Sequence, residues 1–324
     1  MAYSVRHITS FRYQPAVRES VMEVRMQPRT DFRQRCLSFS LNVSPRATVM
    51  VYRDFYGNAV HHFDIPQKHN LIEVSAQAIV DVLPARDFSQ EAASCDWHEL
   101  DERVAQTDYW EMLLPSQFAA PTVLLEKLAA ELKLKRRRKP LALLQELNGK
   151  LYEMFEYVPL STNVDSPIDD ALRARRGVCQ DFAHVMIAGL RGLGLPALYV
   201  SGYIRTIPPP GKPRLAGADA SHAWVAVWCG PAFGWLGLDP TNNLMGCERH
   251  IRVAMGRDYA DVPPTRGVYK GEAESELSVM VAVLPMDAPE PEELPPTTVI
   301  RSKPFSAETL ADVEQQQQQQ QQQQ

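Results

Sequence analysis

The sequence predicts an α+β protein in which a small all-β domain precedes a mixed domain built from helices and an antiparallel sheet. Three observations predict this class. Apolar and polar residues alternate through much of the first 84 residues, with the period of half-buried strands. Apolar residues then recur at helical spacing over 122–155 and 179–190. A pair of strand-like segments follows within 221–239.

The N-terminal domain is predicted to cover residues 1–86 as a small β-sandwich or barrel. Leu37, Phe39, Leu41 and Val43 fall on one face of a strand, and a Gly57-Asn58 turn separates two further strands. Three more segments complete the predicted organisation: a connector, a second domain that ends in a closing strand, and an acidic, proline-rich and polyglutamine tail expected to be disordered. Their ranges are 87–120, 121–285 and 286–324.

Composition narrows the class of function. The chain has 324 residues, 45% of them hydrophobic and 23% charged, with a net charge of −5, which disfavours a nucleic-acid-binding surface. The basic run at 133–139 is interpreted as a solvated helix end; a nucleic-acid or membrane patch is the alternative. The first residues lack an apolar signal-peptide core, and no apolar stretch reaches the roughly 18 residues of a membrane helix. We therefore expect a cytoplasmic protein without membrane or nucleic-acid partners.

The cysteine pattern predicts free thiols. Five cysteines are widely spaced, odd in number and free of a Cys-x-x-Cys pair, which disfavours a disulfide framework or a zinc site. They are Cys36, Cys95, Cys179, Cys229 and Cys247. We expect no metal and no cofactor.

Cys179 is predicted to begin a helix with a buried face. It follows a glycine-containing turn in RRGVCQDF, and Gly192, Gly194 and Pro196 mark the end of the helical pattern. Free N–H groups at a helix start favour a thiolate and can donate to an oxyanion. Asp181, in the first turn, is expected to help begin the helix or anchor a loop. An inert buried thiol is the alternative reading of Cys179.

His222 and Asp239 lie at matching ends of two predicted strands. SHAWVAVW and FGWLGLDP flank the Gly230-Pro231 break, so an antiparallel hairpin would bring His222 close to Asp239. A carboxylate beside an imidazole fixes its tautomer and stabilises the imidazolium, as a thiolate–imidazolium pair requires. Each residue also has an ordinary reading: a satisfied histidine, and a turn aspartate before Pro240. The order Cys, His, Asp within a short span favours a catalytic set.

These segments resemble the transglutaminase-like superfamily in its bacterial branch. GVCQDFAHV, SGYI, SHAWVAVW and GWLGLDPTNN carry the resemblance, which extends over about 113–259, and the β region before them resembles the domain that accompanies this core in many bacterial members. The resemblance implies a papain-like core in which a helix carrying the nucleophile Cys179 packs on a sheet carrying the base His222 and its orienting Asp239. It also implies amide chemistry through an acyl-enzyme.

Several functions remain open at this point. We expect hydrolysis of a peptide or isopeptide bond in a peptide or protein substrate, with acyl transfer to an amine or a non-catalytic binding module as alternatives. The Cys179 N–H is the best oxyanion donor; Tyr157 and Gln180 are candidate supporting groups. The oligomeric state is not predicted.

Other residues are expected to have structural roles. Trp224 and Trp235 are expected to pack the sheet, and His184 is turned too far around the helix to serve Cys179. His61 and His62 would point to opposite faces of a strand, which disfavours a shared metal. The segment 206–220 is expected to form a loop that shapes the substrate cleft.

Overall fold

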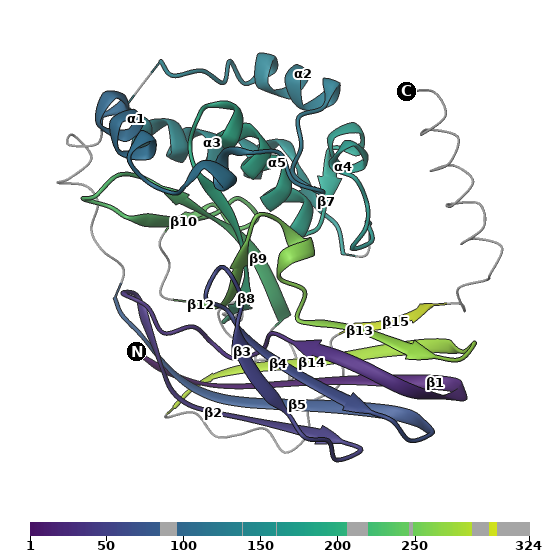
Figure 1. Cartoon of the computed structure of the whole chain (residues 1–324). Helices are drawn as coiled ribbons and strands as arrows, with labels where there is room; N and C mark the ends of the chain where they lie inside the picture. Colours follow the sequence, from purple (N-terminus) through teal and green to yellow (C-terminus); the bar gives the residue numbers. More distant parts are fainter. Residues whose placement is uncertain are drawn as a thin grey trace, which may run out of the picture.

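A computed structural model describes residues 1–84, 96–137, 139–159, 161–205, 220–245, 249–286 and 298–302. Two β-rich units lie against each other, and the helices cover the far side of the second one (Figure 1). Both predicted parts, a sheet-rich N-terminal region and a mixed core, are present. Cys95, Cys247 and the polyglutamine segment lie outside the described residues, as does most of the predicted 206–220 loop.

The N-terminal unit is an eight-stranded antiparallel sheet organised by one long strand, β1. The first half of β1 pairs with β5 and β14, and its second half pairs with β4 and β13. Register shifts interrupt both ladders between Arg12 and Val21, where Glu19 adopts φ 54°. The strands are β1 (Ala2–Val24), β2 (Gln34–Ser44), β3 (Met50–Arg53), β4 (Ala59–Ile65), β5 (His69–Val82), β13 (Thr265–Lys270), β14 (Glu274–Pro285) and β15 (Thr298–Ser302).

This bend lets the two halves of the sheet face each other around a shared core. Met22 and Phe63 from one half pack with Ile72 and Val74 from the other, and all four are at least 97% buried. The predicted sandwich-like arrangement is therefore present, since apolar residues at alternate positions of opposed strands meet face to face.

Two boundaries of the predicted organisation are wrong. The expected closing strand of the second domain is β14, which pairs with β1 along twelve positions and so completes the N-terminal sheet. β15 lies inside the 286–324 segment predicted to be disordered, and it pairs with β14. The first error arises because β14 pairs with a strand some 270 residues away in the sequence, which leaves no local signal. The second arises because the acidic, proline-rich composition of the segment hid a short strand that pairs with β14. The 87–120 connector contains a helix, α1 (Trp97–Ala105), and a 3₁₀ turn, η1 (Trp110–Leu113).

The second unit contains a five-stranded antiparallel sheet in the order β11-β10-β9-β8-β12. Its strands are β8 (Ala197–Ile204), β9 (Ala220–Trp228), β10 (Trp235–Asp239), β11 (Leu244–Met245) and β12 (His250–Gly256). The helices on one side of it are α2 (Val123–Glu131), α3 (Pro140–Met154), α4 (Ile168–Ala174) and α5 (Cys179–Gly192). Helix α5 packs on β8 and β9 because Phe182, Met186 and Leu190 meet the inward residues Val225 and Val227.

The two units share a buried interface. Tyr3, Val80 and Val82 of the N-terminal sheet pack with Ile251 and Val253 of β12. β12 is an edge strand, and its outer backbone groups are satisfied by buried side-chain amides. The Gln34 side chain donates to the Arg252 carbonyl and accepts from the Arg252 N–H. The Asn58 side chain does the same with the carbonyl and N–H of Met255. These four hydrogen bonds, each 2.8 Å long, fix how the units are oriented.

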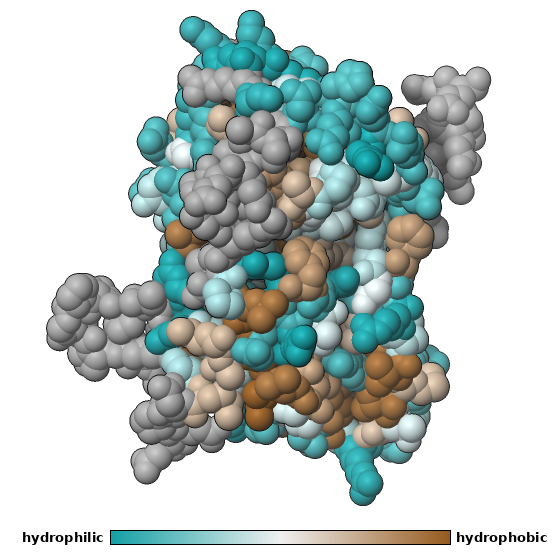
Figure 2. Space-filling model, turned by 90° about the vertical axis from the view of Figure 1, so that its left-hand side faces the viewer, coloured by the Kyte–Doolittle hydropathy of each residue, from teal (hydrophilic) through white to brown (hydrophobic). Residues whose placement is uncertain are grey.

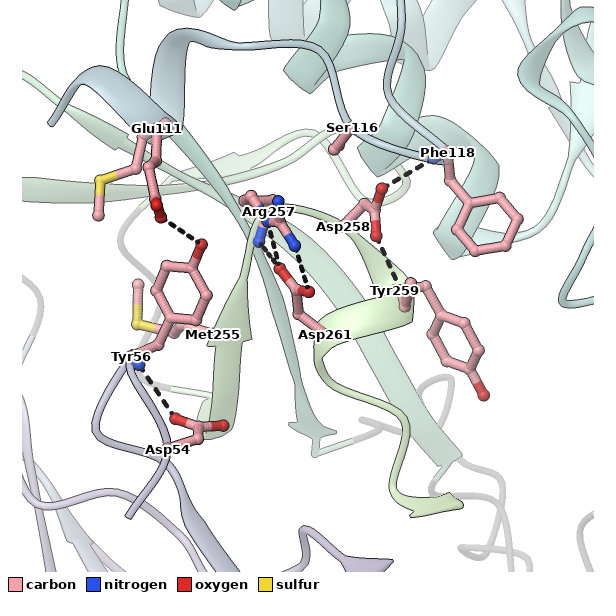
Figure 3. A network of polar contacts seen from close by, with 12 residues as sticks. Asp54, Tyr56, Glu111, Ser116, Phe118, Met255, Arg257, Asp258, Tyr259 and Asp261 are labelled. Atoms are coloured by element: carbon pink, nitrogen blue, oxygen red, sulfur yellow. Dashed lines mark hydrogen bonds and ion pairs between the residues drawn. The ribbon is translucent and has the colours of Figure 1, made fainter. Parts of the chain in front are cut away.

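A second polar network lies where the β3–β4 turn approaches η1 and the turn after β12 (Figure 3). Tyr56 donates to Glu111, and Arg257 forms a two-pronged ion pair with Asp261. Beside it, the buried Arg191 of α5 donates to four acceptors, two of which are the carbonyls of residues 197 and 257. The network holds the C-terminal end of α5 and leaves its N-terminal end, where Cys179 lies, for the site.

The outer surface differs between the two units. Most of the exposed large apolar side chains in the described ranges belong to the N-terminal unit, among them Leu37, Met50 and Phe55. Figure 2 shows such residues gathered on the lower half of one face, below the largely polar surface of the helical layer.

Candidate active site

Cys179 is the first residue of α5, as predicted, and a buried carboxylate holds the turn before it. Asp181 Oδ2 accepts the Val178 N–H at 2.7 Å and the Thr162 hydroxyl at 2.6 Å. A Cβ atom at Gly177 would lie 2.7 Å from the same Asp181 oxygen, so only glycine leaves room for this contact. Burial raises the pKa of Asp181, and these hydrogen bonds oppose that rise. The expected anchoring part of Asp181 is confirmed.

His222 and Asp239 meet as the hairpin predicts. β9 and β10 pair from Trp228↔Trp235 to Val225↔Leu238, which brings the end of β10 to the start of β9. His222 Nε2 lies 2.9 Å from Asp239 Oδ2, and both side chains are buried. The contact is therefore a charge-assisted hydrogen bond in a low-dielectric setting, where it is stronger than at the surface.

Cys179 interacts with the same ring. Burial alone would lower the pKa of His222, but hydrogen bonds to Asp239 and Cys179, together with their charges, raise it to about 10. Because Nε2 faces Asp239, Nδ1 is the ring nitrogen left for the sulfur. A catalytic series of sulfur, imidazole and carboxylate remains a prediction that these contacts are compatible with.

Asp239 receives more donors than the sequence analysis anticipated. Its Oδ2 contacts His250 Nε2 at 2.9 Å and accepts from Asn242 Nδ2 at 2.8 Å, while Oδ1 accepts the backbone N–H groups of Thr241 and Asn242. Burial would raise the pKa of Asp239, yet the hydrogen bonds and charges of His222 and His250 hold it well below its usual range. The carboxylate is therefore ionised throughout the neutral range.

Only part of this set had a signal in the sequence. The DPTNN turn could have indicated Asn242, because an aspartate that starts a turn commonly accepts N–H groups two and three residues on. His250 had no such signal. It begins β12, which is separated from β10 by two strands in the order of the sheet.

A strong curl of the sheet brings His250 across to Asp239. Gly202 of β8 pairs with both His222 and Arg252, and a Cβ there would collide with the Ile251 carbonyl and lie 2.7 Å from the Trp224 ring. The absent side chain lets Trp224 fit between the two histidines. Its ring centroid is 6.0 Å from that of His222 and 4.8 Å from that of His250.

The two candidate supporting residues flank Cys179 in different ways. Tyr157 belongs to β6 (Glu156–Tyr157), which pairs with β7 (Arg176–Gly177) just before the cysteine. Burial and the nearby charge of Cys179 raise the pKa of Tyr157, so its hydroxyl stays protonated at neutral pH. Gln180 donates its amide to the Val164 carbonyl at 2.8 Å and so holds the preceding loop. A role for either residue in stabilising the oxyanion remains a prediction.

The remaining assigned residues are structural. Trp224 is buried against the sheet, and Trp235 packs edge-on to Tyr109 at 5.4 Å. His184 accepts the Tyr259 N–H and stacks on Phe118, so its ring is engaged in packing.

One group could hold a metal ion. Among the described residues, the ligand atoms of His222, Asp239 and His250 lie within 4.8 Å of one another. Both Nε2 atoms are directed at one carboxylate oxygen at hydrogen-bond distance, so an ion bound there would replace these hydrogen bonds.

Comparison with known proteins identifies the family to which this fold belongs. Residues 3–81 match the bacterial transglutaminase-like N-terminal region, and residues 127–240 match the transglutaminase-like superfamily core. The chain belongs to the transglutaminase-like superfamily, in the bacterial group that carries this N-terminal region. The candidate residues Cys179, His222 and Asp239 all lie in the matched core.

Relatives extend the likeness over most of the chain. The uncharacterized protein Rv2569c of Mycobacterium tuberculosis is 39% identical over 304 residues, which are 88% of this chain and 93% of that protein. A protein-glutamine gamma-glutamyltransferase of Pseudomonas aeruginosa is 35% identical over 138 residues, 40% of this chain and 20% of that protein. The crystal structure of a proposed cysteine protease from Cytophaga hutchinsonii shares the fold: its TM-score is 0.70, with 21% identity, over 94% of this chain and 98% of that one.

In the part of the chain that the structure describes, no helix has the length and apolar character needed to cross a membrane.

Proposed function

We propose that the chain is a cysteine enzyme that hydrolyses an amide bond, in a peptide or an isopeptide, through an acyl-enzyme on Cys179. One observation supports the proposal: His222 is hydrogen-bonded to Asp239, and its interactions with Asp239 and Cys179 raise its pKa to about 10. A ring held protonated beside a sulfur favours the thiolate–imidazolium pair, the reactive form of a cysteine nucleophile.

The chemistry follows from these positions. The thiolate attacks the carbonyl carbon, and the carbonyl electron pair moves onto oxygen, next to the N–H groups at the start of α5. His222 then gives its proton to the nitrogen of the leaving amine as the C–N bond breaks. In the second half, His222 takes a proton from water, the resulting hydroxide attacks the thioester, and the acid leaves as the thiolate re-forms. Asp239 holds the ring in one tautomer during both halves.

Acyl transfer to an amine is the second candidate. It is favoured by the likeness of the core to the Pseudomonas aeruginosa gamma-glutamyltransferase. Hydrolysis is preferred because nothing in the site demands an amine as acceptor, and because a protein of the same fold is described as a proposed cysteine protease. A non-catalytic binding module is disfavoured by the intact series of sulfur, ring and carboxylate.

Incubation with a panel of peptides, with and without a primary amine, distinguishes these functions. Mass spectrometry reads cleaved peptide bonds, glutamine converted to glutamate, and incorporated amine as separate products. The matched control is Cys179→Ala, which should form none of them. We expect hydrolysis products to exceed amine incorporation. The reverse ratio would favour acyl transfer, and equal product from Cys179→Ala would refute the cysteine mechanism.

Two attributes stay predictions. A peptide or protein substrate follows from the amide chemistry, and location in the cytoplasm was expected from the composition of the chain. Fractionation of the producing cell tests the location, and recovery outside the cytoplasmic fraction would overturn it.

A further inference from the structure

A cavity of about 250 Å³ lies on the face of the five-stranded sheet that α5 does not cover. Trp224, Trp235 and His250 of the sheet line it together with Phe32 and Arg33 of the N-terminal unit. Cys179 and His222 are not among the residues that line it. Asp239 and His250 are, so the cavity reaches the candidate site from behind the carboxylate.

The size and walls of the cavity fit one aromatic ring. A dry cavity of about 150 Å³ is sufficient to bind benzene, so roughly 250 Å³ leaves room for a ring with one or two small substituents. The walls present the faces or edges of several aromatic side chains, which favour a flat partner through offset or edge-on stacking. A purely apolar ring would leave the polar lining groups without partners.

The charge of the lining favours an anionic substituent. The Arg33 guanidinium donates to the Pro84 carbonyl at 2.8 Å and forms no ion pair within the described ranges. The other lining arginine, Arg252, is already paired with Asp31 at 2.7 Å. Asp239 faces His222 and His250, which share its charge. Among the described lining residues, the Arg33 guanidinium is therefore the cation available for a carboxylate, which it can hold through two hydrogen bonds.

His250 supplies a second polar anchor. The residue is 7% exposed, and its Nε2 is engaged with Asp239. Its Nδ1 is buried without a hydrogen-bond partner among the residues that the structure describes. Buried polar atoms without partners are uncommon in native proteins and call for an explanation. Because Nε2 is engaged with Asp239, Nδ1 is the ring nitrogen left for a ligand, and a hydroxyl group, which can both donate and accept, would satisfy it.

We propose that this cavity is a binding site for a small aromatic carboxylate that bears a hydroxyl group, with Arg33 holding the carboxylate and His250 Nδ1 hydrogen-bonded to the hydroxyl. The site is separate from the sulfur, and binding does not depend on the proposed enzymatic function. It would place a ligand in contact with the histidine that supports Asp239.

Titration of the full chain with four probes tests the proposal. The probes are 4-hydroxybenzoate, benzoate, phenol and benzylamine, read by tryptophan fluorescence and by saturation-transfer NMR. We expect saturable binding in the order 4-hydroxybenzoate, benzoate, phenol, with benzylamine weakest. Absence of saturable binding, or benzylamine binding as well as benzoate, would overturn the proposal. The same titration with Cys179→Ala should be unchanged, which separates this result from the fate of the amide chemistry.

Matched variants assign the two anchors. Arg33→Gln should weaken both carboxylates at least about tenfold and leave phenol unchanged, since a hydrogen bond to a charged group contributes roughly 1.5–3 kcal/mol. Arg35→Gln, an exposed change two residues further along the chain, in β2 and outside the cavity, is the control. His250→Phe should abolish the preference for 4-hydroxybenzoate over benzoate while benzoate still binds. Equal effects of the two arginine variants, or a preference that survives His250→Phe, would contradict the assignment.

Discussion

His222 and His250 share one oxygen atom: each Nε2 lies 2.9 Å from Asp239 Oδ2, and the two ring centroids are 5.7 Å apart. The carboxylate that orients the candidate base is thus itself positioned by a second histidine from the opposite edge of the sheet. His250 is a positioning residue in this arrangement, because it reaches the sulfur only through Asp239 and His222.

His250→Phe should lower the alkylation rate of Cys179 by about tenfold or more, because a charge-assisted hydrogen bond to Asp239 is lost. His250→Gln, whose amide can still donate, should recover part of the rate. Peptide mapping after timed exposure to iodoacetamide measures both. His61→Phe replaces another buried histidine far from the site and controls for general destabilisation. Equal Cys179 alkylation rates in His250→Phe and His61→Phe would contradict the positioning role of His250.

Asp239 and His222 should make the free energy of unfolding fall at both low and high pH. The raised pKa of His222 contributes stability that is fully present below its unfolded value of about 6.5 and is lost as pH rises through about 10. The lowered pKa of Asp239 contributes stability that is present above its unfolded value of about 3.9 and is lost as pH falls through the folded value.

Asp239→Asn should therefore reduce both the acidic and the alkaline limb, that is, both decreases in the free energy of unfolding. Urea denaturation across the pH range measures them. Asp64→Asn, at an exposed position of β4, should leave the profile unchanged. If Asp239→Asn kept both limbs of the natural protein, the coupled pair would not be their source.

Gly202→Ala should destabilise the protein by about 1–3 kcal/mol, because the added Cβ collides with the Ile251 carbonyl and crowds Trp224. It should also slow Cys179 alkylation, since the curl that brings His250 to Asp239 would relax. Gly192→Ala is the matched control: no atom lies within 4 Å of a Cβ there, and the helix should be unaffected or slightly more stable. Equal unfolding free energies for the two variants would refute the packing argument.

Asn58→Ala should cost about 1–3 kcal/mol, because it leaves the N–H and C=O of Met255 buried without partners. Chemical denaturation measures the loss, and Asn42→Ala on the exposed face of β2 should stay close to the natural protein. Similar values for the two would mean that the side-chain amide does not secure the interface.

The sequence predicted the parts of the site that depend on local pattern. Cys179 could be placed because a glycine turn and a helical repeat define a helix start, and His222 could be matched to Asp239 because a hairpin fixes its own register. The resemblance to a known superfamily added the order of the three residues. His250 and the cavity could not be predicted, because both depend on the curl of a sheet and on contact between two units.

The same distinction explains the fold. The alternating strands of residues 1–84 were evident from the local sequence. The pairing of β1 with β13 and β14, near the other end of the chain, was not. β14 has an ordinary strand pattern that is equally compatible with either sheet, and only packing of Val281 and Val283 against Tyr3 and Val80 decides between them.

The pH dependence of Cys179 alkylation tests the central claim most directly. Iodoacetamide is applied to the native protein at pH 6 and pH 9, and each cysteine is quantified by peptide mapping. We expect Cys179 to react at pH 6 well ahead of the other four cysteines, and His222→Gln to abolish this advantage at pH 6 while ordinary thiol reactivity returns at pH 9. Equal labelling of all five cysteines at both pH values, or a His222→Gln protein that labels like the natural one, would contradict it.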